Sequence, residues 1–205
     1  MERWVLLRKG ADFEAIGKKY QISPRLACLI RNRDVIGEEA VDRYLNGTIS
    51  DLYDGMLMKD MDKAIDILKE KILEDKKIRV IGDYDIDGVN ATYILLEGLE
   101  RLGADVDSDI PDRISDGYGL NRHLVERAYE AGVDTLITCD NGIAAADEIA
   151  YGKEMGMTVI VTDHHEVPFD EHDGEKRYRI PPADAVMDPK QPDCLYPFKG
   201  LCGAA

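Results

Sequence analysis

Hydrophobic residues change their spacing near residue 77, and this change divides the chain into two parts. Before it, an apolar stripe at helical spacing is formed by Met61, Ala64, Ile65, Leu68 and Ile72. Ser23-Pro24 is a typical helix start, and Asn46-Gly47 ends a further helix that begins near Gly37. Residues 1–75 therefore predict a helical N-terminal segment that carries no chemical motif.

Beyond this segment, short runs of β-branched residues alternate with helical stretches of about a dozen residues. We predict strands at 78–81, 106–110, 135–138, 158–161 and 183–187, and helices at about 89–102, 121–131 and 144–155. The polar stretch 166–179, which contains Asp173-Gly174, is predicted to be a surface loop. This alternation predicts an α/β fold over residues 76–205, with a parallel sheet and helices on both of its faces.

Three of the predicted strands are followed directly by acidic residues, in the motifs Asp83-x-Asp85-x-Asp87, Asp140-Asn141-Gly142 and Asp163-His164-His165-Glu166. In a parallel sheet the carboxyl ends of the strands share one edge, so we expect these groups to converge. Crowded carboxylates repel one another unless a cation neutralises them. Oxygen ligands with one or two imidazoles suit Mn²⁺ or Mg²⁺ better than Zn²⁺. The pattern predicts two divalent metal ions, a common device for phosphoester hydrolysis.

Other interpretations of these motifs are weaker. Residues 83–88 match the first half of an EF-hand calcium loop, but its twelfth position is Ile94 instead of Glu, and a strand precedes it. Taken singly, Asp140-Asn141-Gly142 is typical of a turn, and a pair of histidines is more often structural than a ligand. Their joint position at strand ends favours a site. Asp184 and Asp188 are interpreted as residues that flank an edge strand.

Composition and charge bear on the location of the protein, the state of its cysteines and its ability to bind nucleic acid. With 44% hydrophobic and 33% charged residues, and no apolar run long enough for a bilayer or a secretory signal, we expect a cytoplasmic protein without a membrane partner. The four cysteines are scattered along the chain, so we predict that they stay reduced and act as packing residues. The net charge of −15 argues against a chain that grips long nucleic acid by itself. It reflects a solvated acidic surface, carboxylates that work with metal, or both.

Asp163-His164-His165 is the signature triplet of the DHH phosphoesterase superfamily, and residues 80–88 resemble its opening motif. Residues 111–121, 138–143 and 192–204 resemble further motifs of the branch of bacterial single-strand-specific exonucleases. The resemblance covers about residues 76–205. It implies a metal-dependent exonuclease that degrades single-stranded DNA from 5′ to 3′ in recombination and repair.

The resemblance also implies roles for individual residues. Two metal ions would be held by Asp85, Asp87, Asp140 and His164, with Asp140 bridging them. His165 would face the scissile phosphate, and Asp83 and Asp163 would orient ligands or water. Contacts to the substrate would come from Arg113, Tyr118 and Asn121, through phosphate binding by the guanidinium and stacking by the tyrosine.

The family pattern contains a further metal-binding aspartate, a C-terminal half and a nucleic-acid-binding domain beyond residue 205. We therefore expect this chain to be a fragment with feeble or no exonuclease activity alone. Expected partners are single-stranded DNA, the missing C-terminal domains, and a single-strand-binding protein or helicase. The alternatives are a DHH phosphoesterase for oligoribonucleotides, cyclic dinucleotides or pyrophosphate, and a non-catalytic replication scaffold. Residues 111–121 argue against the first, and the four metal-ligand residues argue against the second.

Overall fold

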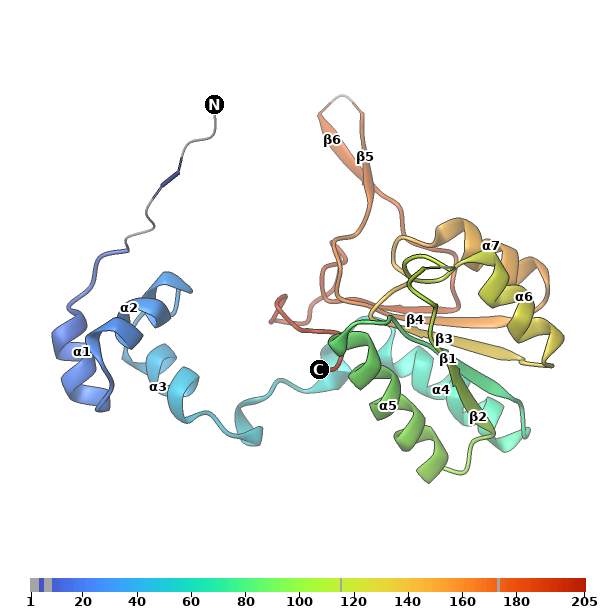
Figure 1. The fold of residues 1–205 in the computed structure, drawn as a ribbon, viewed down its shortest axis with the longest axis horizontal. Helices are drawn as coiled ribbons and strands as arrows, with labels where there is room; N and C mark the ends of the chain where they lie inside the picture. Colours follow the sequence, from blue (N-terminus) through green and yellow to red (C-terminus); the bar gives the residue numbers. More distant parts are fainter. Residues whose placement is uncertain (1–3, 6–8, 115, 173) are drawn as a thin grey trace. The chain divides into compact units, whose positions relative to one another are not determined.

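The computed structural model describes residues 4–5, 9–114, 116–172 and 174–205, which form two compact units, Met1–Leu52 and Tyr53–Ala205 (Figure 1). The smaller unit contains helices α1 (Phe13–Tyr20), α2 (Pro24–Asn32) and α3 (Glu38–Asn46), and a 3₁₀ turn at Ile49–Asp51. Helix α2 begins at the predicted position. Ser23 caps it, because its side-chain oxygen accepts a hydrogen bond from the backbone nitrogen of Leu26 at 3.2 Å.

The larger unit is built on a parallel sheet, which confirms the predicted α/β fold. Its strands are β1 (Ile78–Ile81), β2 (Val106–Asp109), β3 (Thr135–Cys139), β4 (Thr158–Thr162) and β7 (Ala185–Met187), in the order β2-β1-β3-β4-β7. Its helices are α4 (Met61–Leu73), α5 (Ile86–Arg101), α6 (Arg122–Glu130) and α7 (Ala146–Glu154), with a 3₁₀ turn at Gly55–Leu57. Every pair of neighbouring strands in this sheet is parallel.

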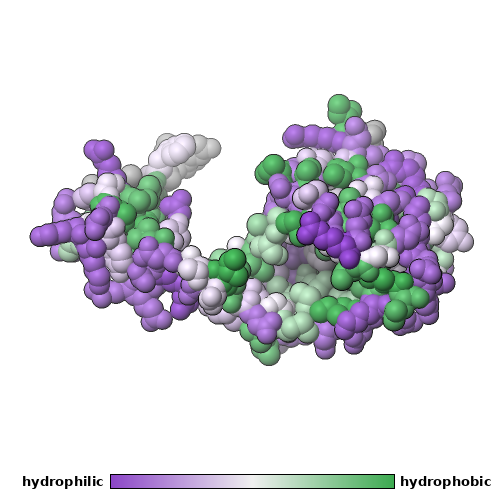
Figure 2. Space-filling model, turned by 90° about the horizontal axis from the view of Figure 1, so that it is seen from below, coloured by the Kyte–Doolittle hydropathy of each residue, from purple (hydrophilic) through white to green (hydrophobic). Residues whose placement is uncertain are grey.

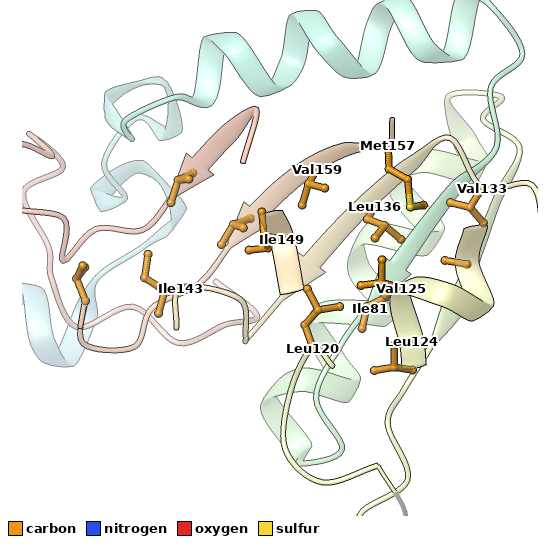
Figure 3. Packing of buried hydrophobic residues seen from close by; sticks show 14 residues of the cluster. Ile81, Leu120, Leu124, Val125, Val133, Leu136, Ile143, Ile149, Met157 and Val159 are labelled. Carbon is orange, nitrogen blue, oxygen red and sulfur yellow. The ribbon is translucent and has the colours of Figure 1, made fainter. Parts of the chain in front are cut away.

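Helices cover both faces of the sheet, as the sequence predicted. On one face, α6 and α7 pack over a buried cluster that includes Leu124, Val125, Leu136, Ile149 and Val159 (Figure 3). On the other, α4 and α5 cover a cluster that includes Ala64, Ala91, Val80, Ile137 and Ile160. The central strand β3 is buried along its whole length. A strand covered on both faces is mostly hydrophobic, since none of its side chains reaches water, and in β3 the polar residues are two buried threonines, Thr135 and Thr138.

Helix α5 begins at Ile86, three residues before the predicted start near Val89. The reason is the side chain of Asp85, which caps the helix by accepting hydrogen bonds from the backbone nitrogens of Asp87 at 2.8 Å and Gly88 at 3.0 Å. The first turn of α5 therefore starts directly at the carboxyl edge of the sheet, and Asp87 lies in that turn.

The predicted surface loop at 166–179 is wrong for most of its length. Strands β5 (Phe169–His172) and β6 (Glu175–Tyr178) pair antiparallel in a hairpin that projects from the sheet (Figure 1). Asp173 of the expected turn lies outside the described residues. All eight strand residues are exposed, so the sequence lacks the alternation that a buried face imposes. The aromatic pair of Phe169 and Tyr178, with ring centroids 5.8 Å apart, stabilises the hairpin instead.

Among the described residues, no helix is long and apolar enough to cross a membrane. All four cysteines are free, and Cys139 and Cys194 are buried as packing residues, whereas Cys202 is exposed.

Candidate metal centre

The site lies at the carboxyl edge of the sheet, where four strands are each followed by a buried aspartate. The strand register aligns Ile81, Thr138, Val161 and Val186. Two residues further along each strand stand Asp83, Asp140, Asp163 and Asp188, which are 1%, 2%, 7% and 0% exposed. We call these four residues the aspartate row. The predicted convergence of the strand-end acids is present, with one more member than the motifs contained.

The turn after β1 brings backbone and carboxylates close together. A Cβ on Gly88 would lie 2.6 Å from the backbone nitrogen of Asp83, so this position requires glycine. The carboxylate of Asp87 accepts hydrogen bonds from the backbone nitrogens of Gly203 at 2.6 Å and Ala204 at 2.9 Å. Burial works to raise the pKa of Asp87, but these two hydrogen bonds, a further one with the Cys202 side chain and the charge of His164 together hold the pKa below its ordinary value. Asp87 therefore stays ionised.

Asp140 lies at the centre of the site, in the left-handed backbone region with φ of 61°. Its Oδ1 lies 2.9 Å from Nε2 of His164, which is also 3.5 Å from Oδ2 of Asp87. Burial and the negative charge of Asp87 raise the pKa of Asp140 to about 6, although His164 acts against them. Close approach of these carboxylates thus costs free energy, which a bound cation would offset.

Two groups of side chains could hold metal ions, and Asp140 belongs to both. One group is Asp83, Asp85 and Asp140, and the other is Asp140, His164 and His165. Within each group, one ligand atom per residue lies within 4.8 Å of the others. Asp87 lies next to the second group, because its Oδ2 is 3.5 Å from Nε2 of His164. The structure thus brings together seven of the strand-end residues that the sequence singled out. Glu166, the eighth, is instead exposed and pairs with Lys190 at 3.0 Å.

Asp163 holds the histidine pair in place. Its Oδ1 accepts hydrogen bonds from the backbone nitrogens of His164 at 2.7 Å and His165 at 3.2 Å, and from Nδ1 of His165 at 2.7 Å. Its Oδ2 accepts from the backbone nitrogen of Ile143 at 2.9 Å. Burial works to raise the pKa of Asp163, but the bonds from His165 and Ile143 hold it below its ordinary value. In turn, Asp163 raises the pKa of His165.

Of the three residues predicted to contact the substrate, Tyr118 and Arg113 lie beside the centre, whereas Asn121 caps a helix. The Tyr118 hydroxyl lies 3.3 Å from Nε2 of His165, and the Tyr118 ring packs edge-on against Tyr84 with centroids 6.3 Å apart. The exposed Arg113 guanidinium lies 5.3 Å from the centroid of the Tyr84 ring, at the rim of the site. Asn121 instead caps α6, because its Oδ1 accepts from the backbone nitrogen of Leu124 at 2.9 Å.

Two parts of the site were missed from the sequence. Asp188 was interpreted only as a residue that flanks an edge strand, although it follows β7 as the other three aspartates follow their strands. The same strand-end rule could have found it. The contact of Gly203 and Ala204 with Asp87 had no local signal, because it joins residues more than 100 positions apart.

A pocket of about 310 Å³ lies beside the centre, with His164 in its wall. Its lining is mainly hydrophobic and comes from α4, α5 and the segment 201–205. Hydrophobic residues also border a hollow on the face of this unit that Figure 2 shows. The carboxylates and imidazoles of the centre are thus flanked by apolar surface, which lowers the local dielectric constant and strengthens their interaction with any bound cation.

The donor set fits hard divalent cations. Its ligand atoms are carboxylate oxygens with one or two imidazole nitrogens, the combination that suits Mn²⁺ and Mg²⁺. Among the described residues, Oδ1 of Asp83 is buried without a hydrogen-bond partner, so this acceptor has a lone pair available for a cation. Fold and site together define an α/β protein with a candidate two-metal centre at the carboxyl edge of a parallel sheet.

Residues 77–205 match the model of the DHH family, N-terminal domain, and the chain belongs to this family. Over 202 residues it is 40% identical to the single-stranded-DNA-specific exonuclease RecJ of Bacillus subtilis (strain 168), a match that covers 98% of this chain and 25% of that protein. The resemblance seen in the motifs is confirmed. The chain spans about a quarter to a third of the length of the curated relatives it matches.

Two solved structures are similar to the chain. The crystal structure of exonuclease RecJ bound to manganese is 39% identical, with a TM-score of 0.57 over 66% of this chain and 33% of that one. The crystal structure of RecJ from Thermus thermophilus in complex with Mn²⁺ is 29% identical, with a TM-score of 0.62 over 98% of this chain and 27% of that one. Both support the fold described above.

Proposed function

We propose that this chain is the metal-binding part of a RecJ-type exonuclease, which hydrolyses phosphodiester bonds of single-stranded DNA from the 5′ end in recombination and repair. The observation that carries the proposal is the pair of metal-ligand groups that share Asp140. The similar curated relatives are single-stranded-DNA-specific exonucleases, and two similar structures hold manganese. The substrate and the direction of cleavage rest on this similarity.

In this proposal two Mn²⁺ or Mg²⁺ ions would be held by Asp85, Asp87, Asp140 and His164, and Asp140 is the residue that both ligand groups share. When bound, the ions would polarise the phosphoryl oxygens and stabilise the charge that develops during hydrolysis. Asp83 is close enough to Asp85 and Asp140 to orient a ligand or to act as one. The backbone nitrogens of Gly203 and Ala204 keep the carboxylate of Asp87 ionised and fixed in direction.

His165 and Tyr118 are proposed to donate hydrogen bonds at the open side of the site. Nδ1 of His165 donates to Asp163, so its Nε2 points toward Tyr118 and the open side of the site. Asp163 raises the pKa of His165, which favours a proton on Nε2 and a hydrogen bond from it to the scissile phosphate. The pKa of Tyr118 is raised by burial and by Asp83, so its hydroxyl stays protonated as a donor.

Residues at the rim would bind the DNA itself. We infer that the guanidinium of Arg113 contacts a phosphate, and that Tyr118 donates to a phosphate or stacks on a base. Asn121 would act through the position of its segment, because its Nδ2 donates to the backbone oxygen of Asp116 while its Oδ1 caps α6. We therefore propose that the segment 111–121 binds the substrate.

We further propose that residues 76–205 are the DHH domain and residues 1–75 a helical segment before it, whose last helix, α4, packs on the sheet of the domain. We also propose that the protein works in the cytoplasm. The curated relatives are three to four times as long as their match to this chain, and full exonuclease activity would require segments like theirs. A single-strand-binding protein or a helicase would deliver the substrate. The alternative of a DHH phosphoesterase for oligoribonucleotides or cyclic dinucleotides is disfavoured by the identity to the RecJ exonucleases.

Calorimetric titration of Mn²⁺ tests the metal centre. We expect the wild-type chain to bind Mn²⁺ saturably, Asp140→Ala to lose this binding, and Asp170→Ala to keep it, because Asp170 lies in the exposed strand β5. Equal binding by Asp140→Ala and the wild type would refute the centre. A second assay compares hydrolysis of single-stranded DNA, oligoribonucleotides and cyclic dinucleotides by the Mn²⁺-loaded chain. Faster turnover of either ribonucleotide substrate would favour the alternative.

A further inference from the structure

The turn that follows β7 presents a lysine at the carboxyl edge of the sheet. Asp188, Pro189 and Gln191 of this turn are buried, whereas the side chain of Lys190 is 27% exposed. Oδ1 of Asp188 accepts a hydrogen bond from the backbone nitrogen of Lys190 at 2.7 Å, the pattern of an Asx turn. Nε2 of Gln191 closes the turn by donating to the carbonyl oxygen of Val186 at 2.7 Å. Two buried polar side chains thus fix the backbone from which Lys190 extends.

The ammonium group of Lys190 lies on the histidine side of the metal centre. Its Nζ is 3.0 Å from Oε1 of Glu166, the residue that directly follows His165. The charge of Lys190 also reaches the imidazole of His165, where it acts against the rise in pKa that Asp163 causes. Lys190 is therefore a neighbour of the ring that is proposed to face the scissile phosphate.

Glu166 is a partner that Lys190 can exchange. Its side chain is 88% exposed, so water and salt screen its attraction to the ammonium group. Exposed ion pairs of this kind contribute little to stability, and their loss costs little. Charge-assisted hydrogen bonds from lysine to phosphate are among the stronger ones in proteins. A phosphate group that enters the site can therefore replace the carboxylate of Glu166.

Lys190 and Arg113 lie on opposite sides of the centre. The guanidinium of Arg113 lies over the ring of Tyr84, which follows β1, whereas Lys190 follows β7. Strands β3 and β4 lie between β1 and β7, and neighbouring strands are about 4.8 Å apart, so the ends of β1 and β7 are separated by roughly 14 Å. One phosphate group is too small to contact both cations. A nucleic-acid strand that crosses the centre can contact both, because each of its nucleotides carries a phosphate.

We propose that Lys190 is a second phosphate-binding residue, which exchanges Glu166 for a backbone phosphate of the single-stranded DNA on the β7 side of the centre. The inference rests on the proposed function, which supplies the DNA. Arg113 and Lys190 would bind different phosphates of one strand, with the metal centre between them. In a chain with a net charge of −15, cations on both sides of the centre supply a local attraction for DNA that the surface as a whole lacks.

Three variants of the ion pair between Glu166 and Lys190 test this role. Lys190→Gln removes the positive charge, Lys190→Arg retains it, and Glu166→Gln removes the competing carboxylate. Both side chains reach solvent, so we expect all three variants to fold. Calorimetric titration of Mn²⁺ into each variant checks that the metal centre is intact.

Lys69→Gln and Asp66→Asn are the matched controls. Lys69 and Asp66 form an exposed ion pair on α4, and their replacement changes the net charge of the chain by the same amount. Lys71, two residues further along α4, pairs with Asp134, which directly precedes β3. This part of α4 therefore lies near the amino ends of the strands, away from the metal centre.

Fluorescence anisotropy of a 3′-labelled oligothymidylate with phosphorothioate linkages measures DNA binding by the Mn²⁺-loaded chain at several salt concentrations. We expect Lys190→Gln to weaken binding about tenfold at low salt. The slope of log K against log salt should fall by about 0.7, the value for one phosphate contact on a single strand. Lys190→Arg should stay within about twofold of the wild type, Glu166→Gln should bind more tightly, and both controls should bind like the wild type.

An unchanged affinity and salt slope in Lys190→Gln would overturn the inference, as would an equal loss in Lys69→Gln or weaker binding by Glu166→Gln. These outcomes leave the proposed function standing, provided that the wild type binds Mn²⁺ and the oligonucleotide. A wild-type chain that binds Mn²⁺ but no oligonucleotide overturns the role of Lys190 together with the proposed substrate. Absence of Mn²⁺ binding refutes the metal centre, and the same oligonucleotide assay without metal then decides the role of Lys190.

Discussion

Replacing Asp163 by asparagine tests whether this buried carboxylate holds the histidine pair. Its two oxygens accept four hydrogen bonds, three on Oδ1 from His164 and His165 and one on Oδ2 from Ile143. An asparagine has one acceptor oxygen and one NH₂ group. If its oxygen replaces Oδ1, the NH₂ group faces the backbone N–H of Ile143, and two donors confront each other in a buried place.

The expected loss of stability follows from these contacts. A hydrogen bond to a charged group contributes about 1.5–3 kcal/mol, and a buried donor left without an acceptor costs about 1–3 kcal/mol. The three bonds on the other oxygen also weaken when the acceptor becomes neutral. The neutral asparagine avoids the cost of burying a charge, and this offsets part of the loss. We therefore expect Asp163→Asn to lower the free energy of unfolding by about 2–4 kcal/mol. Domains of this size are stable by about 5–15 kcal/mol, so the variant should still fold.

Urea unfolding of the metal-free chain, followed by circular dichroism, measures this loss. Circular dichroism is preferable to fluorescence because the single tryptophan, Trp4, is 92% exposed. Asp170→Asn in the exposed hairpin is the control, with an expected change within about 0.5 kcal/mol. A loss below about 1 kcal/mol for Asp163→Asn would contradict the four-bond account, since one unsatisfied buried donor costs that much.

The pH dependence of this difference has a definite sign. The lowered pKa of Asp163 contributes stability that is present above its ordinary value of 3.8 and is lost as the pH falls through the folded pKa. The raised pKa of His165 contributes stability that is present below its ordinary value of 6.5 and is lost as the pH rises through the folded pKa. The gap between wild type and Asp163→Asn should therefore be widest between these two values and narrower on either side.

Three further changes give separate outcomes. A Cβ on Gly203 would lie 2.7 Å from Oδ1 of Asp140, so Gly203→Ala should weaken Mn²⁺ binding at least about tenfold in calorimetry, and equal binding would contradict the close packing of this segment. Gly98→Ala in α5 meets no atom within 4 Å and should raise the free energy of unfolding by about 0.5–1 kcal/mol in urea, whereas a decrease would contradict the open space. Burial works to raise the pKa of Asp107, but the ion pairs with Arg79 and Lys77 together outweigh it and lower the pKa. The stability advantage over Asp107→Asn should therefore be lost as the pH falls through the lowered pKa, and a gap that persists in acid would contradict the pairing.

The sequence by itself determined the sheet and most of the centre, because both depend on local pattern. Strands β1, β3 and β4 are short runs rich in β-branched residues that helices cover on both faces, and such runs can be recognised in the sequence alone. The acids that follow them converge by a general property of parallel sheets. Asp83, Asp140 and Asp163 could therefore be assigned to one site from the chain alone.

Tertiary structure decided the features that depend on pairing or on distant contacts. The hairpin of β5 and β6 has no buried face, so its sequence carries no alternation, and only backbone pairing reveals it. Asp188 joined the aspartate row because β7 pairs with β4 in one register. Asp87 is held by Gly203, 116 positions away. Register and long-range hydrogen bonds depend on the free energy of the whole packed unit, and no local segment of the sequence encodes them.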